Sequence, residues 1–152
     1  MMKQLFKRWS TLVIMLLIPL CGWAQKDLKI MALFDEYGKK KGSTMVTLSK
    51  EMLEAYDMTL YKSITISENE GAIPKAQKYI TEDKKKAKNI KEVINKGLVV
   101  SGYYQLIAKT DKGMNRFILF KVSRKGSVSL VYIEGKLDSE DLVTLLFMFK
   151  TE

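Results

Sequence analysis

Three stretches in the last third of the chain are rich in Val, Ile, Tyr and Phe and are joined by short links that contain glycine. They span residues 98–109, 115–123 and 127–135, and the links hold Gly113 and Gly126. Such side chains favour strands, and glycine supplies the positive φ that tight hairpins need. The pattern predicts a three-stranded antiparallel meander, which commits this part of the chain to a sheet.

Two earlier stretches predict further strands. Residues 43–48 and residues 60–67 (LYKSITIS) alternate apolar and polar side chains, which is the period of a half-buried strand. Between them, Ser49 is placed to cap a short helix that runs through Met58.

Three other segments have helical patterns. Residues 28–37 place four apolar side chains on one helical face: Ile30, Leu33, Phe34 and Tyr37. Residues 73–96 carry two apolar stripes with a polar run between them, which fits two helices or one helix with a solvated middle, and Gly97 ends the segment. Asp138 caps a final helix, with Asp141 three residues on. We expect an α+β fold, an antiparallel sheet with a C-terminal three-stranded meander packed by N-terminal, middle and C-terminal helices.

Parts of the expected meander are apolar on both faces of the sheet. Residues 117–120 and 130–133 have no polar position that a solvated face would show. Two explanations stay open: the remaining helices cover the second face, or that face forms a dimer interface or a ligand pocket.

The first 24 residues have the layout of a secretory signal. Residues 1–10 carry three basic residues and no acid, and residues 11–20 form an apolar run. That run is too short to cross about 30 Å of hydrocarbon as a helix. We expect a signal peptide over residues 1–24, cleaved between Ala24 and Gln25, and a single domain over residues 25–152.

Cys21 opens an alternative, the attachment of a lipid at a lipoprotein signal. Such signals have a small residue before the cysteine, where this chain has Leu20, so cleavage before Gln25 is preferred. Cleavage there removes three basic residues, lowers the formal charge from +9 to +6, and leaves 128 of the 152 residues without a cysteine. The expected location is the periplasm or cell envelope of a Gram-negative bacterium, with only peripheral membrane contact unless a lipid is attached at Cys21.

Histidine is absent from the chain. Its absence excludes Ser-His-Asp and Cys-His catalysis and removes the commonest transition-metal ligand. Glycine-rich phosphate loops and nucleophile motifs are also missing from the sequence. We expect no metal and no cofactor.

Carboxylates are the remaining candidates for acid–base chemistry. Adjacent acids such as Glu82 and Asp83 lie beside turns or helix ends, where solvation or capping explains them. No residue is singled out as catalytic. An enzyme that acts on a cell-wall or glycan substrate stays as the alternative hypothesis, and replacement of Glu134 or Asp138 would test it.

Lysines dominate the basic surplus of the chain. Two patches stand out, residues 39–41 and a second group that is a weak candidate for binding anionic surfaces: Lys84, Lys85, Lys86, Lys88 and Lys91. No aromatic residue is interleaved with these lysines, and export removes most nucleic acid from reach, so no nucleic-acid partner is expected. A solvated lysine-rich helix face explains the second group, and weak docking to anionic lipid headgroups or acidic glycans is its functional alternative.

Several segments resemble small exported proteins of Bacteroidota. The match runs through residues 33–42, 45–53, 101–106 and 115–121 and continues from residue 132 into residue 142. The chain looks like the domain-of-unknown-function family numbered 6108, and family 4252 is similar in pattern. The resemblance implies an envelope protein and carries no catalytic residues across.

These observations predict an exported, non-catalytic domain that binds an unidentified envelope protein or ligand. A homodimer is one form that such binding could take, through the surplus apolar sheet surface. Binding of an anionic membrane or polyanion through the second lysine group is a further alternative.

Overall fold

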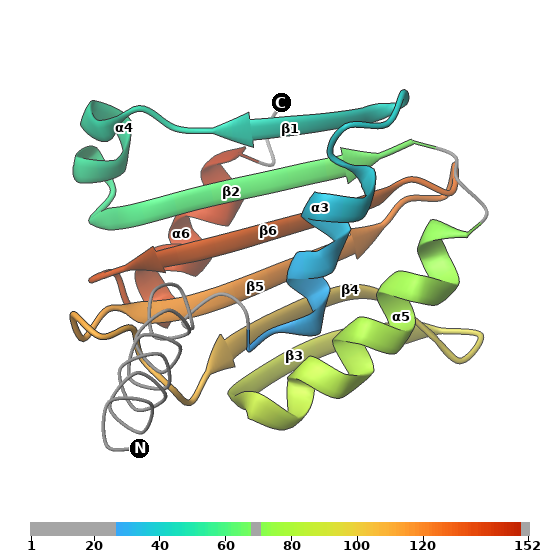
Figure 1. Ribbon diagram of the computed structural model, residues 1–152. Coiled ribbons are helices and arrows are strands. Elements are labelled where there is room, and N and C mark those ends of the chain that lie inside the picture. The colour runs from blue at the N-terminus through green and yellow to red at the C-terminus, as the bar shows by residue number, and fades with distance from the viewer. Residues whose placement is uncertain (1–26, 68–70, 150–152) are drawn as a thin grey trace, which may run out of the picture.

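The computed structural model describes residues 27–67 and 71–149. These residues form a six-stranded antiparallel sheet with the strand order β1-β2-β6-β5-β4-β3 (Figure 1). The strands are β1 (Ser43–Thr47), β2 (Met58–Ile66), β3 (Ala87–Asn95), β4 (Leu98–Leu106), β5 (Asn115–Val122) and β6 (Val128–Gly135). The α-helices are α3 (Ala32–Tyr37), α4 (Lys50–Ala55), α5 (Ala72–Asp83) and α6 (Ser139–Phe149), and short 3-10 turns are η2 (Lys29–Met31) and η3 (Lys84–Lys86).

The expected C-terminal meander is confirmed, and with it the α+β class. Strand β5 pairs with both β4 and β6, and all three run antiparallel in consecutive hairpins. Gly113 and Gly126 in the two links have φ values of 78° and 86°. The glycines therefore supply the left-handed backbone that these turns need.

The helical prediction for residues 73–96 is wrong in its second half. Helix α5 ends at Asp83, and the apolar residues that follow lie in β3, which pairs with β4. Ile90, Val93 and Ile94 are β-branched and fit a strand as well as a helical stripe. Gly97 and the residue before it, Lys96, both have positive φ, 81° and 52°, as in a two-residue hairpin turn. Gly97 thus joins two strands and does not end a helix.

The other predicted elements are confirmed with shifted ends. Residues 29–37 are helical, first as a 3-10 turn and then as α3. The hydroxyl of Ser49 accepts a hydrogen bond from the backbone N–H of Met52 and caps α4, which ends at Ala55 and not at Met58. Strand β2 consequently begins two residues before the expected start, at Met58.

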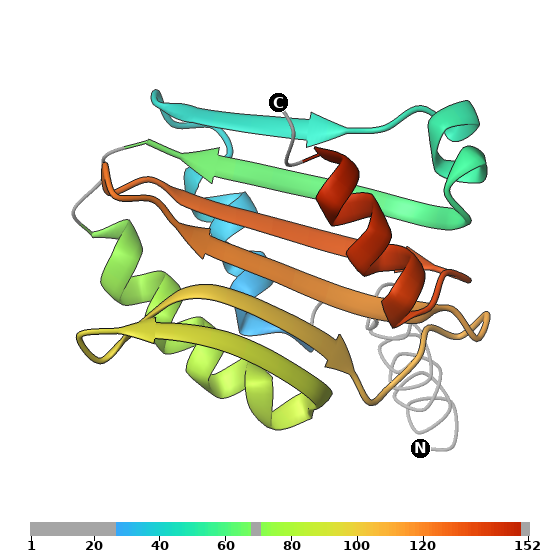
Figure 2. The ribbon, with the colours of Figure 1, turned by 180° about the vertical axis from the view of Figure 1, so that it is seen from behind.

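The two faces of the sheet carry different coverings. One, the N-terminal face, packs against η2, α3 and α5 and forms a large core that includes Ile64, Ile118 and Tyr132. The opposite face, the C-terminal face, carries a smaller cluster that includes Phe117, Ile133 and, from α6, Leu142. Figure 2 shows α6 crossing this face, while no other described helix lies over β3, β4 and much of the central strands. The helices therefore cover the second face only in part.

Candidate functional site

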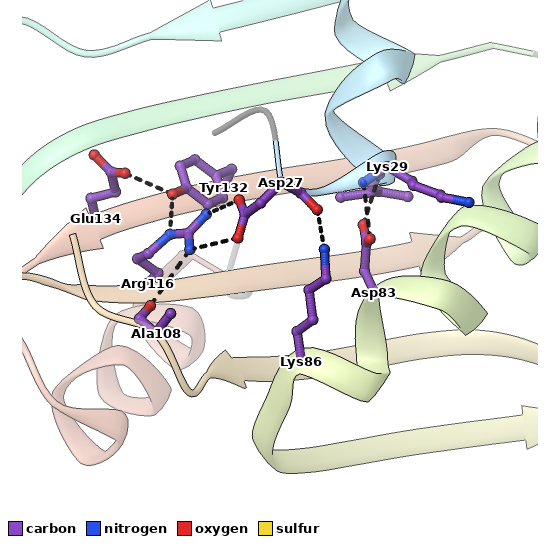
Figure 3. A network of polar contacts seen from close by, with 9 residues as sticks. Asp27, Lys29, Asp83, Lys86, Ala108, Arg116, Tyr132 and Glu134 are labelled. Carbon is purple, nitrogen blue, oxygen red and sulfur yellow. Dashed lines mark hydrogen bonds and ion pairs between the residues drawn. The ribbon is translucent and has the colours of Figure 1, made fainter. Parts of the chain in front are cut away.

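A buried arginine organises the polar contacts of the N-terminal face (Figure 3). Arg116 of β5 is 2% exposed, and its Nε donates to the hydroxyl of Tyr132 at 2.8 Å. Its Nη2 donates to Asp27 Oδ1 at 2.9 Å, and Nη1 donates to the second carboxylate oxygen at 3.3 Å. The Tyr132 hydroxyl in turn donates to Glu134 Oε2 at 2.6 Å. The arginine thus joins neighbouring strands to the start of the described chain.

Burial and hydrogen bonding set the ionisation of this network. Burial alone disfavours the charge of Arg116, but the hydrogen bonds to Asp27 and Tyr132 raise its pKa on balance. Burial, together with the hydrogen bond that the hydroxyl donates to Glu134, raises the pKa of Tyr132. The guanidinium is charged and the phenol is neutral at physiological pH, so neither group is prepared to transfer a proton.

A second carboxylate holds the same N-terminal segment. Asp83, at the end of α5, accepts hydrogen bonds from the backbone N–H groups of Lys29 and Ile30 at 2.9 and 2.7 Å. Lys86 donates to the backbone carbonyl of Asp27. These contacts explain why Asp83 is buried, and they make the network around Arg116 an anchor for residues 27–30 and not an open site.

The acids considered for catalysis have structural partners. Glu134 binds the Tyr132 hydroxyl. Asp138 Oδ1 accepts from the backbone N–H of Asp141 at 2.9 Å, and Asp141 Oδ2 accepts from the N–H of Asp138, which confirms the predicted cap of α6. Across residues 27–67 and 71–149 no group of three or more acidic, His or Cys side chains is placed to hold a metal.

The second lysine group does not form one helix face. Lys84, Lys85 and Lys86 lie in η3, whereas Lys88 and Lys91 lie in β3. Lys84 contacts Glu92 and Lys85 contacts Glu82, each at 3.6 Å between nitrogen and oxygen. Together with the contact of Lys86 to Asp27, these pairings divide the predicted patch and leave Lys88 and Lys91 facing solvent.

The open part of the C-terminal face contains two adjoining hollows that share Lys91 and Tyr103. We call them together the α6 groove. The smaller, of about 680 Å³, reaches the first turns of α6 at Ser139, Glu140 and Val143. The larger, of about 840 Å³, lies over β3 to β6 and is lined by Lys91, Glu92, Val93, Ser101, Gly102, Tyr103, Leu119, Phe120, Lys121, Ser129 and Val131. Both volumes lie in the range of small-molecule sites.

The strand register explains which side chains meet on the floor of the groove. Side chains that pair directly across antiparallel strands share a face of the sheet. One such row runs from Val93 through Ser101, Lys121 and Ser129 to Thr65. The next row runs from Lys91 through Tyr103, Leu119 and Val131 to Ser63. The floor therefore combines a row of hydroxyls around Lys121 with a row in which Lys91 and Tyr103 lie beside the apolar Leu119 and Val131.

A polar cluster attaches the beginning of α6 to the sheet beside the groove. The Tyr103 hydroxyl donates to Ser139 Oγ at 2.9 Å, and Ser139 donates to Gln105 Oε1 at 2.8 Å. Asn89 Nδ2 donates to the same oxygen at 2.7 Å. Burial raises the pKa of Tyr103, although its hydrogen bond with Ser139 opposes the shift. Tyr103 therefore stays neutral and acts as a support of the groove wall.

Of the residues that line the larger hollow, the sequence reasoning named Lys91 as a binding candidate and gave residues 117–120 and 130–133 as part of a face that could form a ligand pocket. It missed Ser101, Tyr103, Lys121 and Ser129, because these residues come together only through strand register. The short links at Gly113 and Gly126 were a usable signal, since a hairpin's turn sets its register. Cys21, Ala24 and Gln25 lie outside the described residues, and so does the predicted signal peptide.

The comparisons with known proteins bear on the family and not on the activity. A family model described as a family of unknown function, DUF6108, matches residues 17–146. The chain belongs to this family. No match was found among curated proteins. DUF6108 membership thus agrees with the resemblance in the sequence. Among the described residues, no helix has both the length and the apolar character to span a membrane.

Proposed function

We propose that this DUF6108 protein is an exported, non-catalytic domain that binds a ligand or partner in the α6 groove. The observation that carries the proposal is the larger hollow of about 840 Å³ on the sheet face that α6 covers only in part. Its floor includes Leu119 and Val131, which are half-buried apolar side chains. Apolar surface that a fold leaves uncovered in a concave site is typical of binding surfaces.

The proposal of export rests on residues 1–24, with their basic start, apolar run and small residues before Gln25. We also propose a Bacteroidota origin and a relation to family 4252, on the resemblance of several segments. The place of action is then the periplasm or envelope of a Gram-negative cell. Intact mass of the native protein from separated periplasmic and membrane fractions tests this. A chain that begins at Gln25 supports free export, a lipid on Cys21 places the domain on a membrane, and an uncleaved cytoplasmic chain contradicts export.

Binding in the groove is tested with an uncharged solvatochromic dye, Nile red, on the purified chain of residues 25–152. We expect its fluorescence to rise with the protein and the rise to be lost in Ser101→Trp, because the indole projects from the floor into the larger hollow and obstructs it. Thr44→Trp is the matched control. Thr44 is an exposed residue opposite Thr65 at the far edge of the same face. A dye response that is absent, or equal in both variants, contradicts binding in the groove.

Self-association is the other use of an open apolar face, and light scattering after size-exclusion chromatography distinguishes it. A monomer that binds the dye supports a ligand site. A stable dimer that Ser101→Trp dissociates identifies the groove as an interface between two copies.

A further inference from the structure

Two lysines face each other across the floor of the α6 groove. Lys91 of β3 lies opposite Tyr103, and Lys121 of β5 lies opposite Ser101, so both project from the C-terminal face on either side of β4. Strands are about 4.8 Å apart and residues rise about 3.4 Å, which places the two Cβ atoms about 12 Å from each other. Two lysine side chains can close that distance, so both ammonium groups can reach one group held above Ser101 and Tyr103.

Two acids, Glu92 and Glu140, line the α6 groove together with Lys91. Glu140 lies in the first turn of α6, at the smaller hollow. Glu92 follows Lys91 in β3 but pairs with Gly102 and points to the opposite face. There its carboxylate accepts from the Tyr104 hydroxyl at 2.7 Å and contacts Lys84 at 3.6 Å. Within the described chain, neither Lys91 nor Lys121 has an ion pair. The larger hollow therefore carries two lysines that form no ion pair with a described acid.

The groups around the lysines complement them. Ser101 and Ser129 flank Lys121 in the register and can donate hydrogen bonds from their hydroxyls. Leu119 and Val131 lie in the next row, toward α6, and offer apolar surface. The groove thus has a cationic, hydrogen-bond-donating part beside an apolar part, and this combination is complementary to an anion that carries an apolar chain.

We infer that the α6 groove binds one single-chain amphiphile with an anionic head. This inference rests on the function proposed above and names its ligand class. The head lies between Lys91 and Lys121, and the chain runs over Leu119 and Val131 toward α6. A free molecule is favoured over a bilayer because a hollow of about 840 Å³ accommodates one ligand and the lysines stand on its floor.

Isothermal titration calorimetry with sodium dodecanoate below its critical micelle concentration tests the inference, with dodecanol and dodecyltrimethylammonium as chain-matched neutral and cationic probes. We expect dodecanoate to bind with one site and at least about fivefold more tightly than either probe, since two partly exposed charge pairs are involved. Raising the salt concentration is expected to reduce this preference.

The lysine pair is tested with the double variant Lys91→Gln/Lys121→Gln. We expect its affinity for dodecanoate to fall at least about fivefold and to equal its affinity for dodecanol. The matched control is Lys112→Gln/Lys125→Gln, which removes the same charge from exposed residues of the two meander links. Its affinity for dodecanoate is expected to match that of the unaltered chain. Equal losses of dodecanoate affinity in both variants would show that net charge alone explains the effect, and they would overturn the inference.

The outcomes separate this inference from the proposed function. If Nile red binds but dodecanoate and dodecanol bind equally, the groove is a binding site and the assignment of an anionic head is wrong. If neither the dye nor dodecanoate binds, both proposals fail. If phosphatidylglycerol vesicles bind through Lys91 and Lys121 while monomeric dodecanoate does not, the lysines recognise a membrane surface and the inference is overturned.

Discussion

The two faces of this sheet are built from the same strands, yet they differ in what covers them. On the N-terminal face, Ile64, Ile118 and Leu130 are at most 1% exposed beneath η2, α3 and α5. On the C-terminal face, Leu119 and Val131 alternate with these residues and stay half-buried. Dimensions explain the difference. Helix α6 has 11 residues and is about 16 Å long, whereas six strands are about 24 Å across. One helix of that size cannot cover this sheet.

The polar groups of the two faces differ in the same way. The buried arginine of the N-terminal face has protein partners for its guanidinium and holds the start of the described chain. The lysines of the C-terminal face, Lys91 and Lys121, are exposed and stand beside apolar surface. The N-terminal face thus holds the larger buried core, whereas the C-terminal face holds a smaller one beside the groove for which we propose binding. Four predictions test this division.

The largest effect is expected at the buried arginine. Arg116→Ala leaves the Tyr132 hydroxyl and Asp27 without their cation and should lower the free energy of unfolding by about 3–5 kcal/mol, as measured by urea denaturation. Asp27→Asn should cost less, because Asp27 is 37% exposed and Arg116 keeps its bond to Tyr132. A loss below about 1 kcal/mol for Arg116→Ala would show that the N-terminal face does not depend on this anchor.

Two buried leucines, one in a helix on each face of the sheet, allow the packing of the two faces to be compared directly. Leu33 of α3 is 0% exposed and Leu142 of α6 is 1% exposed. Leu33→Ala should cost about 4 kcal/mol, near the upper end for buried leucines, because it lies in the larger core. Leu142→Ala should cost about 2–3 kcal/mol, since α6 can shift over an open face and reduce the cavity. Equal losses in urea denaturation would contradict the difference in packing.

The pH dependence of stability is expected to come from the N-terminal face. Burial raises the pKa of Asp83, despite its hydrogen bonds from Ile30 and Lys29. A raised folded-state pKa means that this group's contribution is full below the ordinary aspartate pKa, about 3.9, and is lost as the pH rises through the folded value. Asp83→Asn should therefore flatten the decline in unfolding free energy above about pH 4.

Glu36 supplies the opposite sign and serves as the control for Asp83. The hydrogen bond from Lys75, at 2.8 Å, lowers the pKa of Glu36. Its contribution is therefore present above the ordinary glutamate pKa and is lost as the pH falls through the lower folded value. Glu36→Gln should reduce the loss of stability in acid. If the two variants change the pH profile in the same direction, the environments assigned to these carboxylates are wrong.

The smallest effect on stability is expected at Lys121, one of the two lysines in the larger hollow of the α6 groove. Lys121 is exposed and has no ion pair among the described residues, so Lys121→Ala should change the free energy of unfolding by less than about 0.5 kcal/mol. Binding of dodecanoate should weaken in the same variant. A loss of stability above about 1 kcal/mol would show that Lys121 contributes to folding stability and would contradict the proposed difference between the two faces.

Sequence patterns were sufficient where local chemistry decides the structure. The glycine links predicted the meander, Ser49 and Asp138 were recognised as caps, and four residues between Ile30 and Tyr37 were placed on one buried helical face. The patterns failed at residues 87–95, because Ile90, Val93 and Ile94 have the i, i+3, i+4 spacing of a helix although their β-branched side chains also favour a strand. Pairing with β4 decides between the two, and that contact is not local.

The α+β class, like the absence of histidine and the signal-like first 24 residues, follows from composition and short-range pattern. The sequence by itself therefore determined the fold class and supports the export proposal. The groove depended on tertiary structure. Lys91 and Lys121 are thirty residues apart in the chain, and only the registers of β3 with β4 and of β4 with β5 bring them to one hollow. Strand register, and the part of the sheet that α6 covers, depend on contacts between residues far apart in the sequence. Short-range patterns do not encode such contacts.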